Sequence, residues 1–433
     1  MTAVLAILLS LVGPGVPAGH LPPPARAVHR LLVISIDGLD WRYLKDADRL
    51  GLKIPTLRRL MAEGDAADGV VGENPTITWP AHTTLVTGVP PRQHGILGNW
   101  RPGSTPGNDY WEASAIKTPT LWQAAKDAGL TVGAVTWPVT VTSQIDFDLP
   151  EYFEAGGGGR MALASVATKS TPGLIARIAG CYPAFDGPWV TDRTRTLAAL
   201  YMTRVAHADL TLLHLFDLDA ASHQQGPFTR NADAVLEHID GLISTLLTGA
   251  PPDLTVALVS DHGFERTDRV LNLSAWLAAT GQTTWVARLE AWLPGHAAGD
   301  GLIVMPGLVA TRDPGIAAAL AHEAAVGHSA IGRRVPPAEL ARWAPELGTV
   351  LTAYEPAEHV VFVDDPDNRA LYEKPREPGA HHFWPGRPNF RSVFMLWGPG
   401  VSPRREPEIS MLAIYGRLAA VLGLPAAAAG SRR

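Results

Sequence analysis

The chain of 433 residues contains a single cysteine, Cys181. With one thiol no disulfide can form within the chain, so its stability must come from a hydrophobic core. The same count argues against a thiolate metal centre or redox chemistry as the main activity. Long apolar runs are also missing. The run from Val4 to Val12 falls well short of the about 20 residues that a membrane-spanning helix needs.

Positive charge is not concentrated anywhere along the sequence. The formal net charge is -6, and acidic and basic residues are mixed along the chain. There is therefore no basic footprint for a nucleic-acid polymer, and we expect none as a partner. Apolar residues are plentiful, at 46% against 18% charged. The chain can bury a large core, as one domain with an insertion or as two domains.

The N-terminal residues predict export. The apolar run from Val4 to Val12 has the length of a signal-peptide core, although the residues before it lack the usual positive charge. A Pro/Gly-rich stretch follows and ends in Ala25-Arg26-Ala27, which resembles a cleavage site. We expect a signal peptide over 1–27 and a periplasmic or secreted mature protein without a transmembrane span. An uncleaved membrane-proximal tail and a misassigned start codon are the alternatives.

Strand-like apolar runs alternate with helical patterns after this leader. Runs that are apolar on both faces are typical of parallel strands buried between helices. The alternation predicts an α/β fold with a mostly parallel central sheet and helices on both faces. The expected strands lie within 31–36, 130–137, 209–219, 253–263 and 392–400, and the clearest helices lie within 119–130, 191–207 and 230–249.

The pattern changes over 291–378, where strand-like pieces are short and prolines are frequent. We predict a small inserted α+β cap there. The catalytic core would then comprise 28–290 and 379–425, followed by a flexible tail over 426–433. Four consecutive glycines at 156–159 predict a flexible loop, because no helix follows that could use them to hold a phosphate.

Acidic and imidazole side chains stand where the expected strands end. Asp37 follows the first strand, Asp217 or Asp219 ends the third, and Asp261-His262 ends the fourth. In open α/β sheets, ligands bind at the carboxyl ends of the strands. The sequence therefore predicts that these groups meet at one edge of the sheet.

Further histidines complete a possible metal centre. His223 lies four residues after Asp219, which places both on one face of a helical turn. His381 and His382 lie in a loop before the last strand. Oxygen and nitrogen ligands without sulfur suit zinc or manganese, and six of them with one hydroxyl suit two adjacent metal ions that act on a phosphoryl group. Taken singly, each residue could also be a helix cap or a turn residue. The candidate ligands are Asp37, Asp219, His223, Asp261, His262 and His381.

One threonine is placed to react. In "NPTITWPAHTTLVTG" (74–88), Pro80 suits the first turn of a helix and Gly88 its end, which predicts a short amphipathic helix with Thr78 at or just before its N-cap. The positive end of the helix dipole stabilises a developing alkoxide and a bound phosphate. A threonine hydroxyl is a poor nucleophile unless a metal or a base activates it. Thr78 is therefore a cap, a nucleophile or both.

The sequence resembles the alkaline phosphatase superfamily, most closely its nucleotide pyrophosphatase/phosphodiesterase (type I phosphodiesterase) branch. That branch carries T-F-P-N-H with a nucleophilic threonine, D-x-x-G-H, D-H-G and a late G-x-H-G-Y, in this order. The resemblance covers about Leu31 to Gly400, well in the core and poorly in the cap. The segments that carry it are "VISIDG", "TWPAHTTLVTG…RQHGILGN", "DLDAASHQQGP", "VSDHG" and "GAHHFWPGRPNFRSVFMLWGPG".

The resemblance implies a two-metal site, with zinc as the expected metal, and a double displacement through a phosphothreonine on Thr78. It also implies that Asn99 contacts a phosphoryl oxygen, with the backbone N–H of Trp79 beside it. One metal, which activates Thr78 and is bound by it, would be held by Asp37, Asp261 and His262, and the other by Asp219, His223 and His381.

Three departures from the family pattern matter. Ala81 replaces the asparagine of T-F-P-N-H, and Ser222 replaces the glycine before His223; we expect both to be tolerated. His382 replaces the glycine after the late histidine, so the ligand is His381 or His382. The spacing to the following "GPG" favours His381.

We therefore expect a phosphodiesterase or nucleotide pyrophosphatase that acts on a small phosphate ester such as a nucleotide. A phosphomonoesterase or phosphonoacetate hydrolase would share these ligands, and an inactive binding protein of the same fold is a further alternative. A sulfatase is disfavoured, because it needs cysteine or serine where Thr78 stands. Trp100, Tyr110 and Trp111 could stack on a nucleobase. Packing within the protein is the preferred interpretation of these three.

Overall fold

The computed structural model describes residues 30–101, 109–154, 161–281, 286–288 and 301–426. The predicted signal peptide, the glycines at 156–159 and the predicted tail beyond residue 426 lie outside these residues. Within the described part of the chain, no helix is long and apolar enough to cross a membrane.

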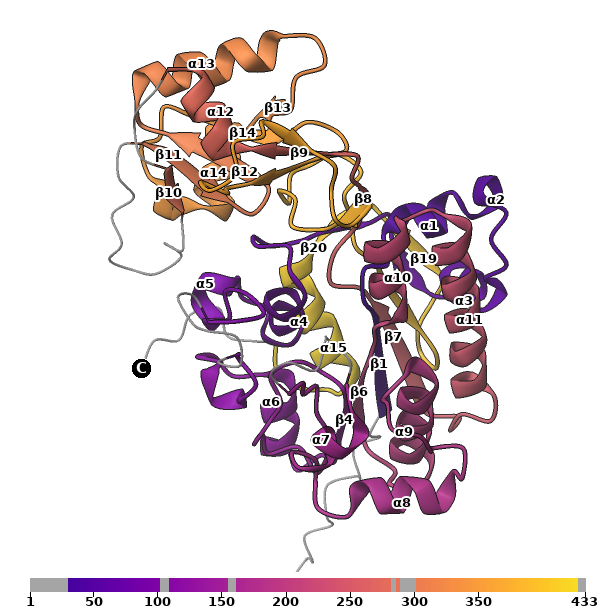
Figure 1. Cartoon of the computed structure of the whole chain (residues 1–433). Coiled ribbons are helices and arrows are strands. Elements are labelled where there is room, and N and C mark those ends of the chain that lie inside the picture. The colour runs from indigo at the N-terminus through magenta and orange to yellow at the C-terminus, as the bar shows by residue number, and fades with distance from the viewer. Residues whose placement is uncertain (1–29, 102–108, 155–160, 282–285, 289–300, 427–433) are drawn as a thin grey trace, which may run out of the picture.

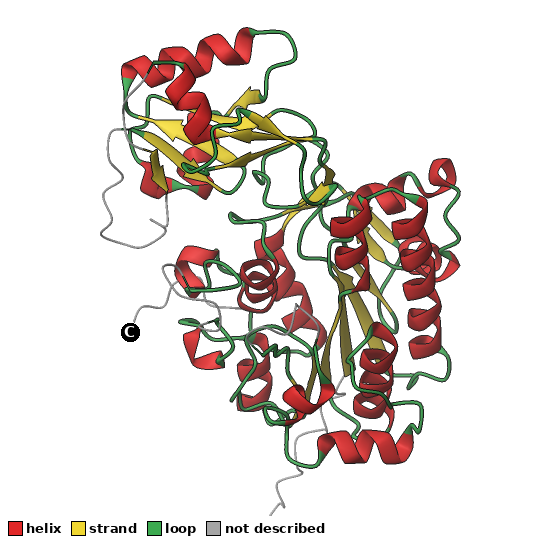
Figure 2. Ribbon diagram, in the orientation of Figure 1, coloured by secondary structure: helices red, strands yellow, loops and turns green. Residues whose placement is uncertain are grey.

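The core is built on an eight-stranded sheet with the order β19-β2-β18-β7-β1-β6-β4-β5 (Figures 1 and 2). The strands β7, β1, β6, β4 and β5 run parallel, and β18 pairs antiparallel with both β7 and β2. The predicted mostly parallel sheet is confirmed. Its strands are β1 (Arg30–Ile36), β2 (Asp65–Ala67), β4 (Val132–Val135), β5 (Phe147–Leu149), β6 (Leu210–Leu215), β7 (Leu254–Val259), β18 (Phe394–Trp397) and β19 (Arg404–Glu406).

Helices cover both faces of this sheet, as predicted. Successive residues of a strand point to opposite faces. Leu31 and Val33 of β1 accordingly pack in one hydrophobic cluster, while Leu32 and Ile34 pack in another. The first cluster includes residues of α4 (Thr78–Thr87), α6 (Leu121–Asp127) and α15 (Ile414–Val421), and the second includes residues of α3 (Pro55–Glu63), α9 (Asp192–Arg204) and α11 (Arg230–Leu247).

Shorter helices complete the core. Two of them, α1 and α10, begin shortly after β1 and β6 and therefore flank the carboxyl ends of these strands. The shorter core helices are α1 (Trp41–Lys45), α2 (Ala47–Leu50), α5 (Pro91–His94), α7 (Leu163–Ala167), α8 (Leu174–Cys181) and α10 (Asp217–Gln225).

A second, smaller part lies above the carboxyl ends of the core strands (Figure 1). It contains a five-stranded sheet with the order β10-β11-β12-β14-β13 and a three-stranded sheet with the order β15-β9-β16. We call this part the cap. Its elements are β9 (Arg269–Asn272), α12 (Leu273–Ala279), β10 (Val286–Arg288), β11 (Leu302–Met305), β12 (Leu308–Thr311), α13 (Pro314–Ala325), β13 (Ile331–Arg334), α14 (Pro337–Trp343), β14 (Thr352–Pro356), β15 (Val360–Val363) and β16 (Tyr372–Glu373).

Two short strand pairs lie between the cap and the core. In one, β8 (Glu265–Arg266) pairs with β17 (Gly379–Ala380), where the chain enters and leaves the cap. In the other, β3 (Val70–Val71) pairs with β20 (Ile409–Ser410). The boundaries at 291 and 378 remain predictions, and β9 and α12 also pack within the cap cluster.

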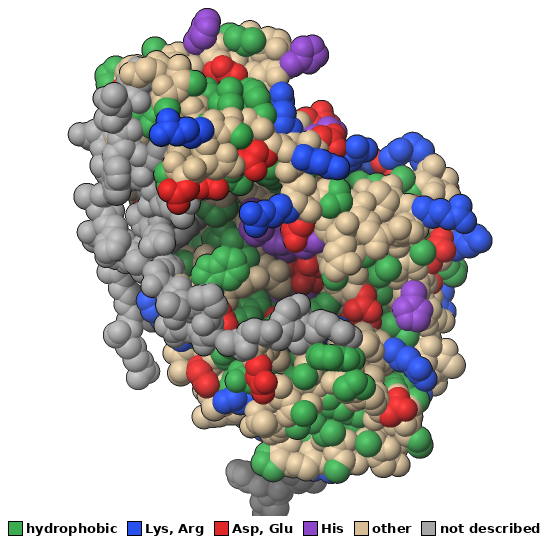
Figure 3. All heavy atoms as spheres, in the orientation of Figure 1, with side chains coloured by type: hydrophobic (Ala, Val, Ile, Leu, Met, Phe, Trp, Pro, Cys, Tyr) green, Lys and Arg blue, Asp and Glu red, His purple; other side chains and the backbone are tan. Residues whose placement is uncertain are grey.

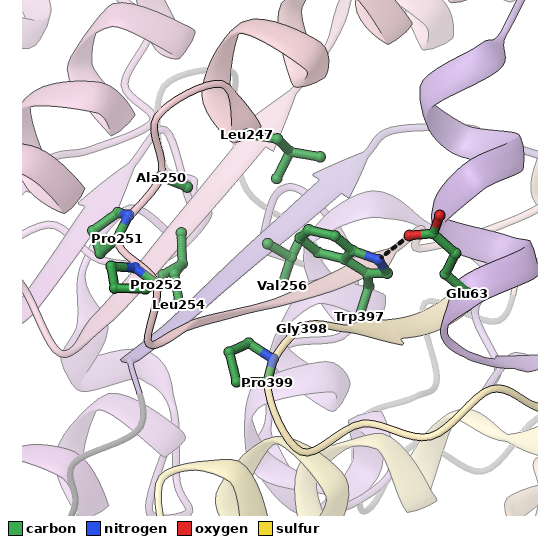
Figure 4. A pocket seen from close by; sticks show the side chains of 10 residues that line it. All are labelled: Glu63, Leu247, Ala250, Pro251, Pro252, Leu254, Val256, Trp397, Gly398 and Pro399. Atoms are coloured by element: carbon green, nitrogen blue, oxygen red, sulfur yellow. Dashed lines mark hydrogen bonds between the residues drawn. The ribbon is translucent and has the colours of Figure 1, made fainter.

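A cavity of about 390 Å³ lies at the opposite end of the core sheet, where β7 begins and β18 ends (Figure 4). Its lining is mostly apolar, and the Trp397 indole N–H donates to Glu63 at 3.0 Å. None of the predicted site residues lines it. The predicted site residues that follow β1 and β7 lie at the other end of the sheet.

Glu73 is a buried carboxyl group between the core and the cap. Glu73 is only 4% exposed. The side-chain amide of the next residue, Asn74, donates to the carbonyl of Trp343 in α14 at 3.1 Å. Burial raises the pKa of Glu73 to about 7, although Arg342 and Arg92 act in the opposite direction. The folded protein therefore holds this proton more tightly than the unfolded chain does.

We expect Glu73→Gln to gain stability relative to wild type as the pH rises. The raised pKa of Glu73 stabilises the folded wild-type protein fully at a pH below 4.5, the ordinary pKa of a glutamate. This stabilisation is lost as the pH rises through about 7, the pKa of Glu73 in the folded protein. Glutamine does not titrate, so the free energy of unfolding of the variant should gain about 3 kcal/mol on wild type between pH 4 and pH 8. Urea unfolding across this range measures the gain, with the exposed Glu358→Gln as the control. A constant difference between Glu73→Gln and wild type would contradict the prediction.

Candidate metal centre

The carboxyl ends of β1, β6 and β7 meet below the cap (Figure 1). Asp37 directly follows β1, and its backbone N–H continues the ladder by donating to Leu215 at 2.9 Å. Asp261 and His262 follow β7 after one residue. Figure 3 shows histidine and acidic side chains at the floor of a hollow between the core and the cap.

The structure brings the six candidate ligands into one cluster. Asp219, His223 and His381 form one group, and Asp37, Asp219 and His262 form another; the ligand atoms within each group lie within 4.8 Å of one another. Asp261 adjoins them, with its Oδ2 at 3.1 Å from His262 Nε2. Asp219 belongs to both groups and so lies at the middle of the cluster.

Several atoms of this cluster lack partners that a folded protein normally provides. Asp37 Oδ1, Asp219 Oδ1, Asp261 Oδ2 and His262 Nε2 are buried and have no hydrogen bond within the described residues. Unpaired polar atoms and unpaired charges are costly to bury. Divalent cations would satisfy these oxygen and nitrogen atoms together, so the cluster fits metal ions such as zinc.

The electrostatics of the cluster agree with this. Burial, and then repulsion by Asp219, raises the pKa of Asp37 well above its usual range. Burial and repulsion by Asp37 do the same to the pKa of Asp261. Burial lowers the pKa of both His262 and His381, which keeps their imidazoles neutral. Neutral imidazole is the form that binds metal ions.

Backbone carbonyls orient three of the imidazoles. Nδ1 of His223 faces the carbonyl of Gly379 at 3.2 Å and also Glu377 Oε2 at 2.9 Å, and Nδ1 of His381 faces the carbonyl of Thr76 at 3.1 Å. Nδ1 of His262 faces the carbonyl of Gly263 at 3.3 Å. A carbonyl oxygen only accepts, so each Nδ1 carries the proton and each Nε2 keeps its lone pair for a metal.

The geometry also favours one of two neighbouring histidines. His381 belongs to the group with Asp219 and His223, whereas His382 belongs to neither group of the described residues. The backbone N–H of His382 donates to Thr76 at 3.3 Å. His381 is thus the better placed of the two, and its role as a ligand remains a prediction.

Thr78 is the first residue of α4, and its N-cap is Ile77. The expectation that Thr78 lies at or before the N-cap is therefore wrong by one residue. Gly88 ends the helix in the left-handed conformation, at φ 70°, as predicted. The predicted amphipathic character is also wrong, because all ten residues of α4 are buried. The helix packs against α15 and α6, and its apolar residues belong to the same cluster as Leu31 and Val33.

Asn99 and Trp79 are bonded to each other. The backbone N–H of Trp79 donates to Asn99 Oδ1 at 3.0 Å. This bond fixes the orientation of the amide, because an N–H can only face its oxygen, and it leaves Asn99 Nδ2 as the remaining donor. The contact between the Trp79 N–H and a phosphoryl oxygen remains a prediction, and that N–H already has a partner in the structure.

The three aromatic residues considered for nucleobase stacking lie in different surroundings. Tyr110 is buried in a small cluster with Trp79, so the packing interpretation holds for it. Trp111 is half-buried and meets the Trp79 ring edge-on, at 4.7 Å between centroids. Trp100 is 65% exposed.

Two buried histidines escaped the sequence analysis as parts of the site. His214 Nε2 lies 3.0 Å from Asp37 Oδ2, and His82 Nδ1 lies 2.8 Å from the carbonyl of Thr78. His82 also contacts Ser35 through Nε2 at 2.9 Å. A signal for both was present: Ser35 and His214 interrupt two apolar strands at paired positions of β1 and β6. Buried polar residues in such strands require partners, which points to a network.

A mostly parallel sheet with carboxylates and imidazoles gathered at the carboxyl ends of β1, β6 and β7 is the arrangement expected of the alkaline phosphatase superfamily, and the family match places the chain in that class. Within that class, the chain belongs to the type I phosphodiesterase / nucleotide pyrophosphatase family, whose model matches residues 31–408.

Individual relatives are distant. Human ectonucleotide pyrophosphatase/phosphodiesterase family member 1 is 25% identical over 272 residues, which cover 59% of this chain and 25% of the human protein. A mouse protein named bis(5'-adenosyl)-triphosphatase is 26% identical over 250 residues, which cover 54% of this chain and 47% of the mouse protein. The chain spans about a quarter to half of the length of these curated relatives.

Solved structures show the same fold. Murine ectonucleotide pyrophosphatase/phosphodiesterase 5 has a TM-score of 0.58 at 18% identity, covering 92% of this chain and 96% of the mouse chain. A threonine-to-alanine form of that mouse protein, described as inactive, has been solved in complex with AMP.

Proposed function

We propose that this protein is a two-zinc phosphodiesterase or nucleotide pyrophosphatase that acts through a phosphothreonine on Thr78. The convergence of six oxygen and nitrogen ligands, four of which hold a buried unpartnered atom, carries the proposal. Family membership and the activities in the relatives' names support hydrolysis of phosphate esters. The AMP complex of the mouse relative supports a nucleotide-like substrate.

The start of α4 is tied to the cluster through two histidines. His82 donates to the carbonyl of Thr78, and its Nδ1 lies 3.6 Å from Asp261 Oδ2. His381 is bonded to the carbonyl of Thr76, two residues before Thr78. These contacts support a role for Thr78 beside the metal centre.

In the proposed reaction, Asp37, Asp261 and His262 would hold one metal ion, with Thr78 as a further ligand. Asp219, His223 and His381 would hold the second. The bound ions would lower the pKa of the attacking hydroxyl and place positive charge beside the reacting oxygens.

The other steps of the proposed reaction are carried out by side chains of the protein. Thr78 Oγ attacks phosphorus, the bond from phosphorus to the leaving oxygen breaks, and water then cleaves the phosphothreonine and restores the hydroxyl. Asn99 Nδ2 donates to a non-bridging oxygen, where negative charge builds up in the transition state. The positive end of the α4 dipole favours the same charge.

A comparison of substrates tests the proposal. We expect about two zinc ions per chain and the highest kcat/KM for bis-p-nitrophenyl phosphate or a dinucleotide, with activity lost on chelation. A preference for p-nitrophenyl phosphate or phosphonoacetate would replace the diesterase by one of the alternative hydrolases. Metal-free protein that is inert toward all four compounds would identify a binding protein instead.

We propose further that the mature protein is exported after loss of residues 1–27. The leader-like composition of these residues supports this, as do the names of the relatives as ectoenzymes. N-terminal sequencing of the protein from culture medium or periplasm tests it; a protein that keeps residue 1 in the cytoplasm would refute it.

A further inference from the structure

A series of buried polar contacts links the metal centre to Asn99. His214 Nε2 lies 3.0 Å from Asp37 Oδ2. His214 Nδ1 faces the carbonyl of Thr136 at 3.1 Å and lies 3.6 Å from Glu151 Oε2, which is longer than a hydrogen bond. Glu151 Oε1 accepts from the Trp79 indole N–H at 2.9 Å. The backbone N–H of Trp79 donates to Asn99 Oδ1 at 3.0 Å. We call Asp37, His214, Glu151, Trp79 and Asn99 the buried polar chain.

The fold alone does not account for the residues in the middle of the buried polar chain. His214, Glu151 and Trp79 are at most 4% exposed, and Glu151 Oε2 has no hydrogen bond within the described residues. Replacing buried ion pairs by apolar residues of similar volume is often neutral or stabilising. A histidine and a glutamate at these positions therefore point to a role beyond stability.

The two ends of the buried polar chain share one feature. At Asp37, His214 occupies Oδ2 and leaves Oδ1 unpartnered within the described residues, facing the metal centre. At Asn99, Trp79 occupies Oδ1 and leaves Nδ2 to donate. Each end thus has one atom fixed by the protein and the other available for a ligand.

We propose that His214 and Glu151 are positioning residues of the hydrolase. His214 fixes the carboxylate of Asp37 for metal binding, and Glu151 fixes Asn99 through Trp79. This inference rests on the proposed function, because it assigns partners to a metal ligand and to a phosphate-binding residue. Trp79 is central to it: its indole supplies an N–H that the phenylalanine of the T-F-P-N-H pattern lacks.

Zinc affinity tests the His214 end. His214→Phe and His214→Asn remove the ring nitrogen that contacts Asp37 Oδ2, and we expect the zinc dissociation constant to rise at least about tenfold in each. His214→Gln places an amide donor near the original Nε2 and should restore most of the affinity. His94→Phe is the matched control, because His94 is also fully buried but bonds Thr84 and the N–H of Ile96 rather than a ligand. A folded His214→Phe or His214→Asn protein with wild-type zinc affinity would overturn this half of the proposal.

Kinetic coupling to Asn99 tests the Glu151 end. Trp79→Phe keeps an aromatic ring and removes the indole N–H, and Glu151→Leu removes its acceptor. We expect each to lower kcat/KM for bis-p-nitrophenyl phosphate about tenfold without changing zinc content, while Glu151→Gln, which keeps an acceptor oxygen, stays near wild type. In an Asn99→Ala background, Trp79→Phe should have little further effect, because both act on one contact. Full additivity of the two substitutions would overturn the link between Glu151 and Asn99.

The inference and the proposed function fail in different ways. Wild-type protein that neither binds zinc nor hydrolyses any phosphate ester refutes the function. Active, zinc-loaded wild type whose His214 variants keep their zinc affinity, and whose Trp79→Phe variant keeps its kcat/KM, refutes the positioning roles alone.

Discussion

Thr78→Ala should lose at least about a thousandfold in turnover of a phosphodiester while it keeps its fold and its metal ions. The substitution removes the only atom that is proposed to bond to phosphorus. The helix should tolerate it, because α4 has no side-chain cap bond from Thr78 or from its N-cap residue Ile77. The six other metal ligands remain in place, so zinc content should stay near two per chain.

A second threonine of the same helix provides the control. Thr87 lies at the last position of α4, and its hydroxyl donates to the carbonyl of Thr83 at 2.7 Å. Thr87→Ala removes one buried hydroxyl from the same element and should cost about 1 kcal/mol of stability without a large loss of kcat/KM. Thr78→Ala with wild-type turnover would refute the nucleophile. Similar activity losses in both variants would show that α4 is merely sensitive to substitution.

The sequence predicts those parts of the site that depend on residues close together in the sequence or on the ends of parallel strands. Asp37 and Asp261 each end an apolar run, and the carboxyl ends of parallel strands meet at one edge whatever the intervening chain does. The helix periodicity likewise relates Asp219 to His223. These relations need no knowledge of how distant segments pack.

The hydroxyl groups of α4 explain one failed expectation. Threonines at 83, 84 and 87 make the helix look polar on one side, yet their hydroxyls donate to the carbonyls of Trp79, Pro80 and Thr83, four residues earlier. A threonine that satisfies itself within the helix can be buried on any face. Hydrophobic patterning therefore cannot tell a buried helix of this kind from an amphipathic one.

The contacts of His214 could not be predicted in the same way. Its partner Asp37 lies 177 residues earlier in the sequence, and Thr136, whose carbonyl faces its other ring nitrogen at 3.1 Å, lies 78 residues earlier. Only the strand order β1-β6-β4 brings these three residues together. A lone histidine in an apolar strand signals that a partner exists, and the tertiary structure decides which one.

Asp219→Asn is expected to have the second large effect. Asp219 belongs to both candidate metal groups, and its Oδ1 is a buried atom without a hydrogen bond within the described residues. An asparagine keeps the shape of the side chain and removes its charge. We expect zinc content to fall from about two per chain to one or less, and kcat/KM to fall at least about a thousandfold, because a bound metal ion supplies several kcal/mol of charge stabilisation.

Asp217→Asn is the matched control, since Asp217 lies two residues earlier on α10 and was the other candidate at this strand end. Its side chain is 44% exposed and lies 3.8 Å from Arg195. It belongs to neither candidate metal group of the described residues. Asp217→Asn should therefore retain both zinc ions and most of the activity, and equal losses in the two variants would contradict the assignment.

The stability of metal-free protein separates a metal ligand from a structural carboxylate. Repulsion by Asp219 helps to raise the pKa of Asp37, so the metal-free cluster holds charges that oppose one another. Removing the charge of Asp219 relieves this repulsion, and metal-free Asp219→Asn should be at least as stable as metal-free wild type in thermal unfolding. Zinc should raise the unfolding temperature of wild type much more than that of the variant, because only wild type binds both ions tightly. A variant that is less stable than wild type without metal, yet equally stabilised by zinc, would show that Asp219 supports the fold rather than the metal centre.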